Sequence, residues 1–136
     1  MLFRSLGVVA AFNKAIADFI EDSGLAVDFE CSGTLSVNSH VGIALYRIFQ
    51  EALRNIYKHA RASKVHISLT IDSRNRLSLV VRDDGRGLLS DPNAERVGNS
   101  GIGLLTMRER AEDLGGQFII DSKSGYGCRI MVTVPL

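Results

Sequence analysis

The stretch "FQEALRNIYKHA", from Phe49 to Ala60, combines apolar residues at helical spacing with four polar residues of different chemistry. Seven residues at intervals of three and four form one apolar stripe of a helix: Leu45, Ile48, Phe49, Ala52, Leu53, Ile56 and Ala60. The four polar residues lie along one border of this stripe, where residues four apart share a strip of helix surface: Glu51, Asn55, Lys58 and His59. A carboxylate, an amide, an ammonium group and an imidazole beside a core predict a polar binding edge.

The same helix also fits a simpler interpretation. In an ordinary amphipathic helix, Glu51 and Lys58 would form a solvated pair on the flank of the core-facing stripe. The helix alone does not decide between these interpretations, so the decision rests on other parts of the chain.

Length and composition limit the possible classes of protein. A chain of 136 residues with 46% hydrophobic content is sufficient for one core and short for two domains. The 16 Lys and Arg residues nearly balance 15 Asp and Glu residues, which gives no bulk attraction for nucleic acid or a membrane surface. Cys31 and Cys128 lack metal-site or disulfide-framework spacing and are expected to be reduced. We therefore expect a single soluble domain with no nucleic-acid partner.

The hydrophobic pattern predicts three helices and five strands. The helices are expected over residues 4–24, 39–61 (with Asn38 or Ser39 as N-cap) and 104–114, the last ending at Gly115 and Gly116. The strands are expected over residues 25–31, 64–72, 76–84, 117–123 and 128–136, with a loop over 85–103. This order favours an α+β two-layer sandwich, in which a mixed, mostly antiparallel sheet of about five strands carries the three helices on one face.

Two glycine motifs add to the polar edge. "DDGRG" places Asp83, Gly85 and Gly87 at a strand end, where a ligand can approach the backbone and the carboxylate can accept from an amine such as that of adenine. The motif also fits a tight turn. "GNSGIGLLTMRER" opens a helix with Gly101 and Gly103, where free N–H groups and the positive dipole end suit phosphate oxygens. Neither a GxxxxGK[ST] loop nor a GxGxxG fingerprint occurs, which excludes the commonest nucleotide folds.

Together, the three motifs resemble the ATP-binding catalytic domain of sensor histidine kinases, within the GHKL superfamily that also holds gyrase B, Hsp90 and MutL. In this comparison "QEALRNIYKHA" is the N box, "DDGRG" the G1 box and "GIGL" the G2 box. The stretches "LYRIFQEALRNIYKHARASKV" and "GIGLLTMRERAEDLGG" are similar to the subgroup that includes the nitrate sensors and the membrane-fluidity sensor DesK. The resemblance runs from about Leu45 to Pro135 and implies the Bergerat ATP-binding fold.

The resemblance implies roles for the residues that match. Asn55 would hold Mg²⁺ through its amide oxygen, and Asp83 would hydrogen-bond the adenine amine. Glu51 would be catalytic, as a base or orienter for an incoming imidazole. The implied ATP-binding set is Asn55, Lys58, His59, Asp83, Gly85, Gly87, Gly101, Gly103 and Leu104, with residues 88–100 as a lid.

The implied function is binding of Mg²⁺ and ATP and donation of the γ-phosphate to a histidine in two-component signal transduction. That histidine stands on a dimerisation hairpin in the family, and neither His40 nor His66 has this context, so we expect both to be structural. We expect residues 1–24 to be a helix that follows such a hairpin and packs on the domain, and 25–136 to be the catalytic domain. The resemblance also implies a response-regulator partner and a homodimeric full-length protein anchored in the inner membrane, with this domain cytoplasmic and monomeric as a fragment.

Two other functions stay open at this stage. An anti-sigma-factor-type serine kinase has a chain of about this size, although the "MRERAEDLGG" helix favours a histidine kinase. The third possibility is a nucleotide-gated interaction module without catalysis. It is supported by Cys128, which stands where the family usually has a threonine near adenine, whereas Glu51 and Asn55 argue against it.

Overall fold

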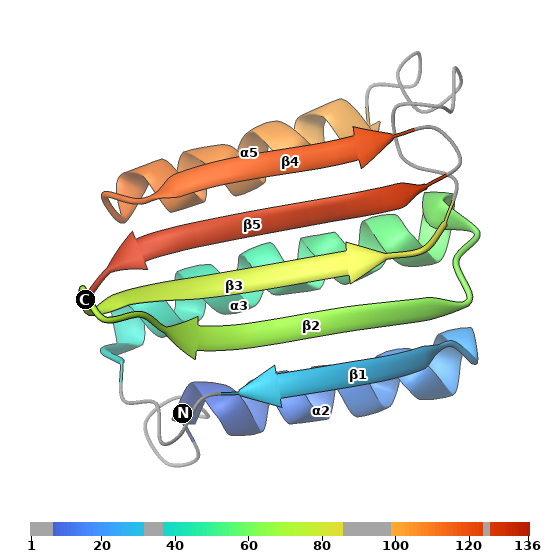
Figure 1. Cartoon of the computed structure of the whole chain (residues 1–136), viewed down its shortest axis with the longest axis horizontal. Helices are drawn as coiled ribbons and strands as arrows, with labels where there is room; N and C mark the ends of the chain where they lie inside the picture. Colours follow the sequence, from blue (N-terminus) through green and yellow to red (C-terminus); the bar gives the residue numbers. More distant parts are fainter. Residues whose placement is uncertain (1–6, 32–36, 86–98, 124–125) are drawn as a thin grey trace.

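The structure, a computed structural model, describes residues 7–31, 37–85, 99–123 and 126–136, without the side chains of 59–60, 99–102 and 123. Its two layers are a five-stranded sheet and three α-helices that cover one face of it (Figure 1). The helices are α2 (Gly7–Ser23), α3 (Ser39–Asn55) and α5 (Asn99–Asp113). The strands are β1 (Ala26–Cys31), β2 (Lys64–Ile71), β3 (Arg76–Asp83), β4 (Gln117–Lys123) and β5 (Gly127–Pro135). The predicted α+β two-layer sandwich is confirmed.

The order of strands across the sheet is β1-β2-β3-β5-β4. β1 runs parallel to β2, and the other neighbours are antiparallel, as expected for a mixed sheet. Because β5 lies between β3 and β4, the start of β5 meets the end of β3, and Cys128 is the register partner of Asp83. Two residues far apart in the sequence are thereby placed side by side.

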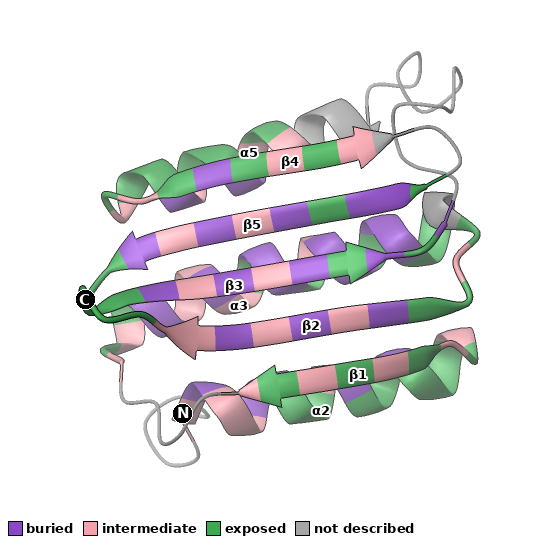
Figure 2. Ribbon diagram, in the orientation of Figure 1, coloured by how far each residue is buried: buried purple, intermediate pink, exposed green. Residues whose placement is uncertain are grey.

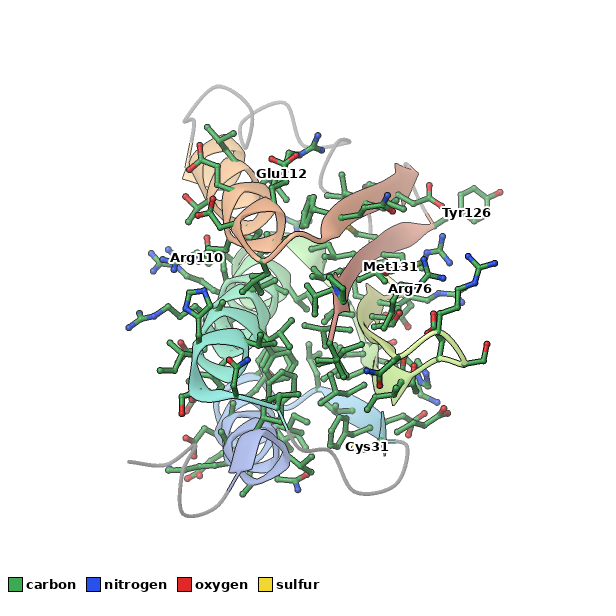
Figure 3. All side chains as sticks on the ribbon, turned by 90° about the vertical axis from the view of Figure 1, so that its left-hand side faces the viewer. Cys31, Arg76, Arg110, Glu112, Tyr126 and Met131 are labelled. Carbon is green, nitrogen blue, oxygen red and sulfur yellow. The ribbon has the colours of Figure 1, made fainter. Side chains whose placement is uncertain are left out.

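The core lies between the sheet and the helices (Figure 2). Alternate residues of β2 and β3 are buried, which are Val65, Ile67, Leu69, Leu77, Leu79 and Val81. On the helical side, the rings of Phe12 in α2 and Phe49 in α3 stack with centroids 4.2 Å apart. Met131 and Tyr126 lie on the opposite side of the sheet from the helices, and Arg110 on the outer side of the helices (Figure 3). The period-two and helical patterns in the sequence thus correspond to the buried faces.

Helix α3 begins as expected and ends differently. The side chain of Asn38 caps it, because its Oδ1 accepts from the backbone N–H of Val41 at 2.9 Å. After Asn55 the chain makes a π-helical turn, η1 (Ile56–Ala60), which ends at Arg61 with a left-handed φ of +51°. A π-helical turn is wider than an α-helical one, so the expected straight strip of residues four apart is wrong beyond Asn55. Such turns occur frequently at functional sites.

Helix α5 begins at Asn99, earlier than the predicted start at residue 104. The expected loop over 85–103 is therefore wrong in its last part, because the low helix propensity of Gly101 and Gly103 suggested a break. Gly103 is buried against α3, where an added Cβ atom would overlap the carboxylate end of the Glu51 side chain. At the other end, the predicted stop at Gly115 is confirmed, with φ of +75°.

Candidate functional site

Asp83 is the last residue of β3 and is only 5% exposed. Like Val81, it faces the helices, because alternate residues of a strand point to the same side. Its Oδ1 accepts a hydrogen bond of 2.8 Å from the backbone N–H of Gly85. Burial raises the pKa of the Asp83 carboxyl above its usual range, against the opposing effect of hydrogen bonds from the Gly85 and Cys128 backbones. The group is a buried acceptor that favours a ligand with N–H donors.

Asn55 is the last residue of α3 and is 4% exposed. Its Nδ2 is buried and has no hydrogen-bond partner within the part of the chain that the structure describes. A buried polar atom without a partner costs free energy, and a bound ligand can provide that partner. Asn55 therefore has the properties of a binding residue more than of a core residue.

A narrow cavity between α3 and the sheet brings Asn55 and Asp83 together. Its lining comes from Ala52, Asn55 and Ile56 on the helical side and from Val81, Asp83, Cys128 and Ile130 on β3 and β5. Two polar side chains thus converge on an otherwise apolar cavity of about 10 Å³, which has the composition of a small-molecule site but room for no more than one water molecule.

Cys128 forms the β5 side of this cavity and is a free, buried thiol. Burial, and secondarily the charge of Asp83, raises the pKa of this thiol to about 12. The thiol therefore stays protonated at neutral pH and is a weak hydrogen-bond donor beside the carboxylate. Cys31, the other cysteine, is also free and lies in β1, so no disulfide links the two.

Glu51 lies on α3 one turn before Asn55 and is half-buried. Its carboxylate is packed against Gly103 in the first turns of α5, so closely that a Cβ atom at Gly103 would overlap Oε1. Leu104, the next residue, packs against the core. The residues predicted from the first and third motifs are therefore neighbours in space.

Of the remaining predicted residues, some lie within the described part of the chain and others do not. Gly85 is buried and directs its N–H at Asp83, whereas Lys58 is exposed on η1 and does not line the cavity. The side chain of His59, the residue Gly87 and most of the predicted lid lie outside the described residues. Gly101 is described only as backbone in the first turn of α5.

The comparison with known proteins agrees with this geometry. Residues 40–136 match the family described as "Histidine kinase-, DNA gyrase B-, and HSP90-like ATPase". The chain belongs to this family. It follows that the domain binds ATP, and the resemblance of its three motifs is confirmed. The site between α3, β3 and β5 is the candidate ATP site of this ATPase domain.

Individual relatives of the ATPase domain are histidine kinases by name. The chain is 35% identical over 137 residues to the signal transduction histidine-protein kinase/phosphatase DegS of Brevibacillus brevis, covering 100% of this chain and 34% of that protein. It is 33% identical over 130 residues to the sensor histidine kinase LiaS of Bacillus subtilis, covering 96% of this chain and 34% of that protein. The chain thus spans about a third of the length of these relatives.

Solved structures share the fold of the ATPase domain. The blue-light activated histidine kinase of Erythrobacter litoralis EL346 superposes with a TM-score of 0.76 at 21% identity, over 92% of this chain and 40% of that one. The Acinetobacter baumannii histidine kinase AdeS superposes with a TM-score of 0.70 at 17% identity, over 94% of this chain and 62% of that one. At these identities the likeness concerns the fold alone.

Sequence reasoning missed one residue of this region, Asp84. Its carboxylate accepts hydrogen bonds from the backbone N–H of Ser63 at 2.8 Å, from the Ser63 hydroxyl at 2.6 Å and from the backbone N–H of Lys64 at 3.0 Å. These bonds lower the pKa of Asp84, and the bond from the Ser63 hydroxyl has the largest effect. Two successive aspartates at the end of a strand are a usable signal, because they point to opposite sides.

Two further observations concern membranes and metals. None of the described helices is both long and apolar enough to cross a bilayer. Within the described ranges, no three His, Cys, Asp or Glu side chains are grouped so that they could hold a metal ion.

Proposed function

We propose that the chain is the ATP-binding catalytic part of a sensor histidine kinase, which donates the γ-phosphate of ATP to a histidine of a dimerisation domain. The observation that carries this proposal is the shared cavity of Asn55 and Asp83, in which both side chains are buried and the amide of Asn55 lacks a full set of partners. The names of the relatives DegS and LiaS support the kinase activity. They favour it over a serine kinase or a module without catalysis.

The adenine would enter at the Asp83 end of the cavity, and the walls would have to move apart to admit it, because the cavity volume of about 10 Å³ holds no more than one water molecule. The carboxylate accepts from the exocyclic amine, while Gly85 N–H holds one of its oxygens in place. Val81 and Ile130 offer apolar contacts to the base from neighbouring strands. This combination of one oriented acceptor and apolar walls recognises a flat heterocycle that carries an amine.

The phosphates would lie toward Asn55 and the start of α5. Mg²⁺ requires hard oxygen ligands and takes most of them from phosphate and water, so a single amide oxygen from Asn55 suffices on the protein side. When bound, the ion would neutralise charge on the phosphates during transfer. Backbone N–H groups at the first turn of α5, around Gly101 and Gly103, suit phosphate oxygens. Lys58 and His59 would add positive charge beside them.

Glu51 would be the catalytic carboxylate. It lies one turn before Asn55 and borders the start of α5. Because these two groups would hold the phosphates, Glu51 would face the γ-phosphate. From there it would accept a proton from, or orient, the incoming imidazole. Phosphoryl transfer depends mainly on position and charge, and these residues provide both.

The rest of the protein follows from the same proposal. Residues 1–24 would follow a dimerisation hairpin that carries the phosphoacceptor histidine, and residues 25–136 would form the catalytic domain. A response regulator would take the phosphoryl group from that histidine. We propose a homodimeric full-length protein anchored in the inner membrane, with this domain cytoplasmic and monomeric when isolated.

The proposal is tested by calorimetric titration of the 136-residue chain with a non-hydrolysable ATP analogue, with and without Mg²⁺. Asn55→Ala and Asp83→Ala should each weaken binding about tenfold or more, as expected when a bond to a charged group is lost. Asn55→Ala should also remove the dependence on Mg²⁺.

Asn38→Ala is the matched control. It makes the same substitution at the other end of α3, where it removes the N-cap bond to Val41 and costs about 1 kcal/mol of stability. It should leave the affinity unchanged. If the unaltered chain binds no nucleotide, or if Asn38→Ala weakens binding as much as Asn55→Ala, the assignment of the site is wrong. The kinase activity itself would be shown by acid-labile phosphate on the full-length protein after incubation with ATP.

A further inference from the structure

The carboxylate of Asp84 fastens the segment that follows η1 to the end of β3. It accepts three hydrogen bonds from two successive residues, Ser63 and Lys64, at 2.6 to 3.0 Å. The backbone N–H of Asp84 also donates to the Lys64 carbonyl at 3.3 Å. Four bonds thus join the residue that follows β3 to Ser63 and Lys64 at the start of β2.

The fastened segment leads directly out of the candidate site. After η1, the chain turns at Arg61 with a left-handed φ of +51°, and Ala62 packs against the core. Ser63 follows, and its carbonyl accepts from the backbone N–H of Ala26 at 3.3 Å, so it is held by β1 as well as by Asp84. The exit of the π-helical turn therefore has a fixed position relative to the sheet.

Asp84 also adjoins the other side of the site, because the preceding residue is Asp83. The two side chains point in opposite directions: Asp83 lines the cavity, and Asp84 holds Ser63. One pair of residues thus connects the β3 wall of the cavity with the chain that leaves its helical wall. Movement of one wall relative to the other would break bonds to Asp84.

We infer that Asp84 is a positioning residue for the nucleotide, which keeps Asn55 and the η1 turn at the correct separation from Asp83. This inference rests on the proposed ATP site. Asp84 itself is exposed, and its oxygens already accept bonds from the chain, so it acts through Asp83 and Asn55 and not by contact with the nucleotide. An error of about 1 Å in such a separation is sufficient for a large loss of function.

The same hairpin contains a matched control, Asp72, at its opposite end (Figure 1). Its carboxylate also accepts three hydrogen bonds, from the backbone N–H groups of Arg74 and Arg76 at 2.9 Å and from Arg76 Nε at 3.0 Å. Both aspartates have a lowered pKa because of these bonds. Only Asp84 adjoins the cavity, so the two differ in location more than in chemistry.

The test compares Asp84→Ala with Asp72→Ala in the complete 136-residue chain. ADP with Mg²⁺ is titrated by calorimetry, and thermal unfolding midpoints are measured on the same samples. Both variants should lower the midpoint to a similar extent. Asp84→Ala should weaken ADP binding about tenfold or more, and Asp72→Ala by less than about twofold. Asp84→Asn should restore much of the affinity, because its oxygen can accept from the two backbone amides and its NH₂ can donate to the Ser63 hydroxyl.

Two results overturn the inference, and they are distinguishable. If the unaltered chain does not bind ADP, the proposed ATP site is wrong and the inference falls with it. If the unaltered chain binds ADP and the two alanine variants lose affinity equally, only the positioning role is wrong. Should Asp84→Ala fail to fold, Ser63→Ala removes only the 2.6 Å hydroxyl bond and is judged by the same comparison with Asp72→Ala.

Discussion

The carboxylate of Glu51 occupies the space that a Cβ atom at Gly103 would need. The contact joins the middle of α3 to the beginning of α5, two helices that approach each other at the candidate phosphate end of the site. The absence of a side chain at Gly103 thus sets the position of the residue that we propose as catalytic.

Gly103→Ala should therefore reduce phosphoryl transfer more than stability. The atom that the new methyl group meets is the tip of a flexible side chain, which can rotate away at small cost. Glu51 would then be displaced, and transfer in the full-length kinase should fall about a hundredfold, within the usual range for a general base. The double variant, which combines Glu51→Ala with Gly103→Ala, should transfer the phosphoryl group no more slowly than Glu51→Ala alone. Additive losses would show that Gly103 acts independently of Glu51.

Asp83→Asn should separate binding from stability. The folded-state pKa of Asp83 is raised, so its favourable contribution to stability is complete below the unfolded value of about 3.8 and is lost as pH rises through the folded value. At pH 7, above the unfolded value, the raised pKa makes the buried carboxyl a cost to stability, and the asparagine variant should be at least as stable as the parent in urea unfolding. Below pH 4 the advantage should disappear.

Nucleotide binding by the same variant should change in the opposite direction. The carboxylate is the proposed acceptor for adenine, and its replacement should weaken ATP binding about tenfold to a hundredfold at pH 7. Affinity of the parent should fall with decreasing pH as Asp83 is protonated, and the variant should lack this pH dependence. Equal pH dependence in both proteins would contradict the role of Asp83.

The layers of the fold were predictable because they depend on local periodicity. The alternation in residues 64–71 and 76–83 and the helical spacing around Phe49 identify buried faces without any knowledge of long-range contacts. The three sequence motifs likewise located Asn55, Asp83 and Gly103. Local pattern and resemblance were therefore sufficient to select residues that the fold places near one another, and their roles stay predictions.

Other features depend on contacts between distant segments. The local sequence of glycines favours a loop, yet α5 already begins at Asn99, and Gly103 in its second turn packs against Glu51 of α3. The π-helical turn after Asn55 is not encoded by a simple period. The role of Asp84 requires Ser63 to lie beside the end of β3, which only the sheet register establishes. A sequence pattern contains none of these distances.

Cys128→Thr should strengthen nucleotide binding. The thiol lies beside Asp83 in the cavity and, with a pKa of about 12, is protonated and a weak donor. A threonine hydroxyl adds one good hydrogen bond near adenine, worth about 1 kcal/mol or about a fivefold gain in affinity. Cys31→Thr, made in β1 outside the cavity, is the control and should not change the affinity. Unchanged binding by both variants would mean that the β5 wall does not contact the base.

Gly127→Ala should damage both the sheet and the site, and Gly24→Ala provides the comparison. Both glycines have positive φ, +89° at Gly127 and +73° at Gly24, and alanine in this region costs about 1–2 kcal/mol. Space distinguishes the two positions. A Cβ atom at Gly24 meets nothing within 4 Å, whereas at Gly127 it would overlap the backbone carbonyl of Asp83.

The backbone of β3 cannot rotate away as a side chain can, so the Gly127 variant should lose a further 1–3 kcal/mol or so. The overlap lies at Asp83 itself, and the displaced strand end should weaken ATP binding about tenfold or more. Urea unfolding and calorimetry on the two variants measure these effects separately. Gly24→Ala should lose stability alone, because its strain lies at the end of α2. If both variants retain full affinity, the end of β3 does not have to be held in place for the nucleotide to bind.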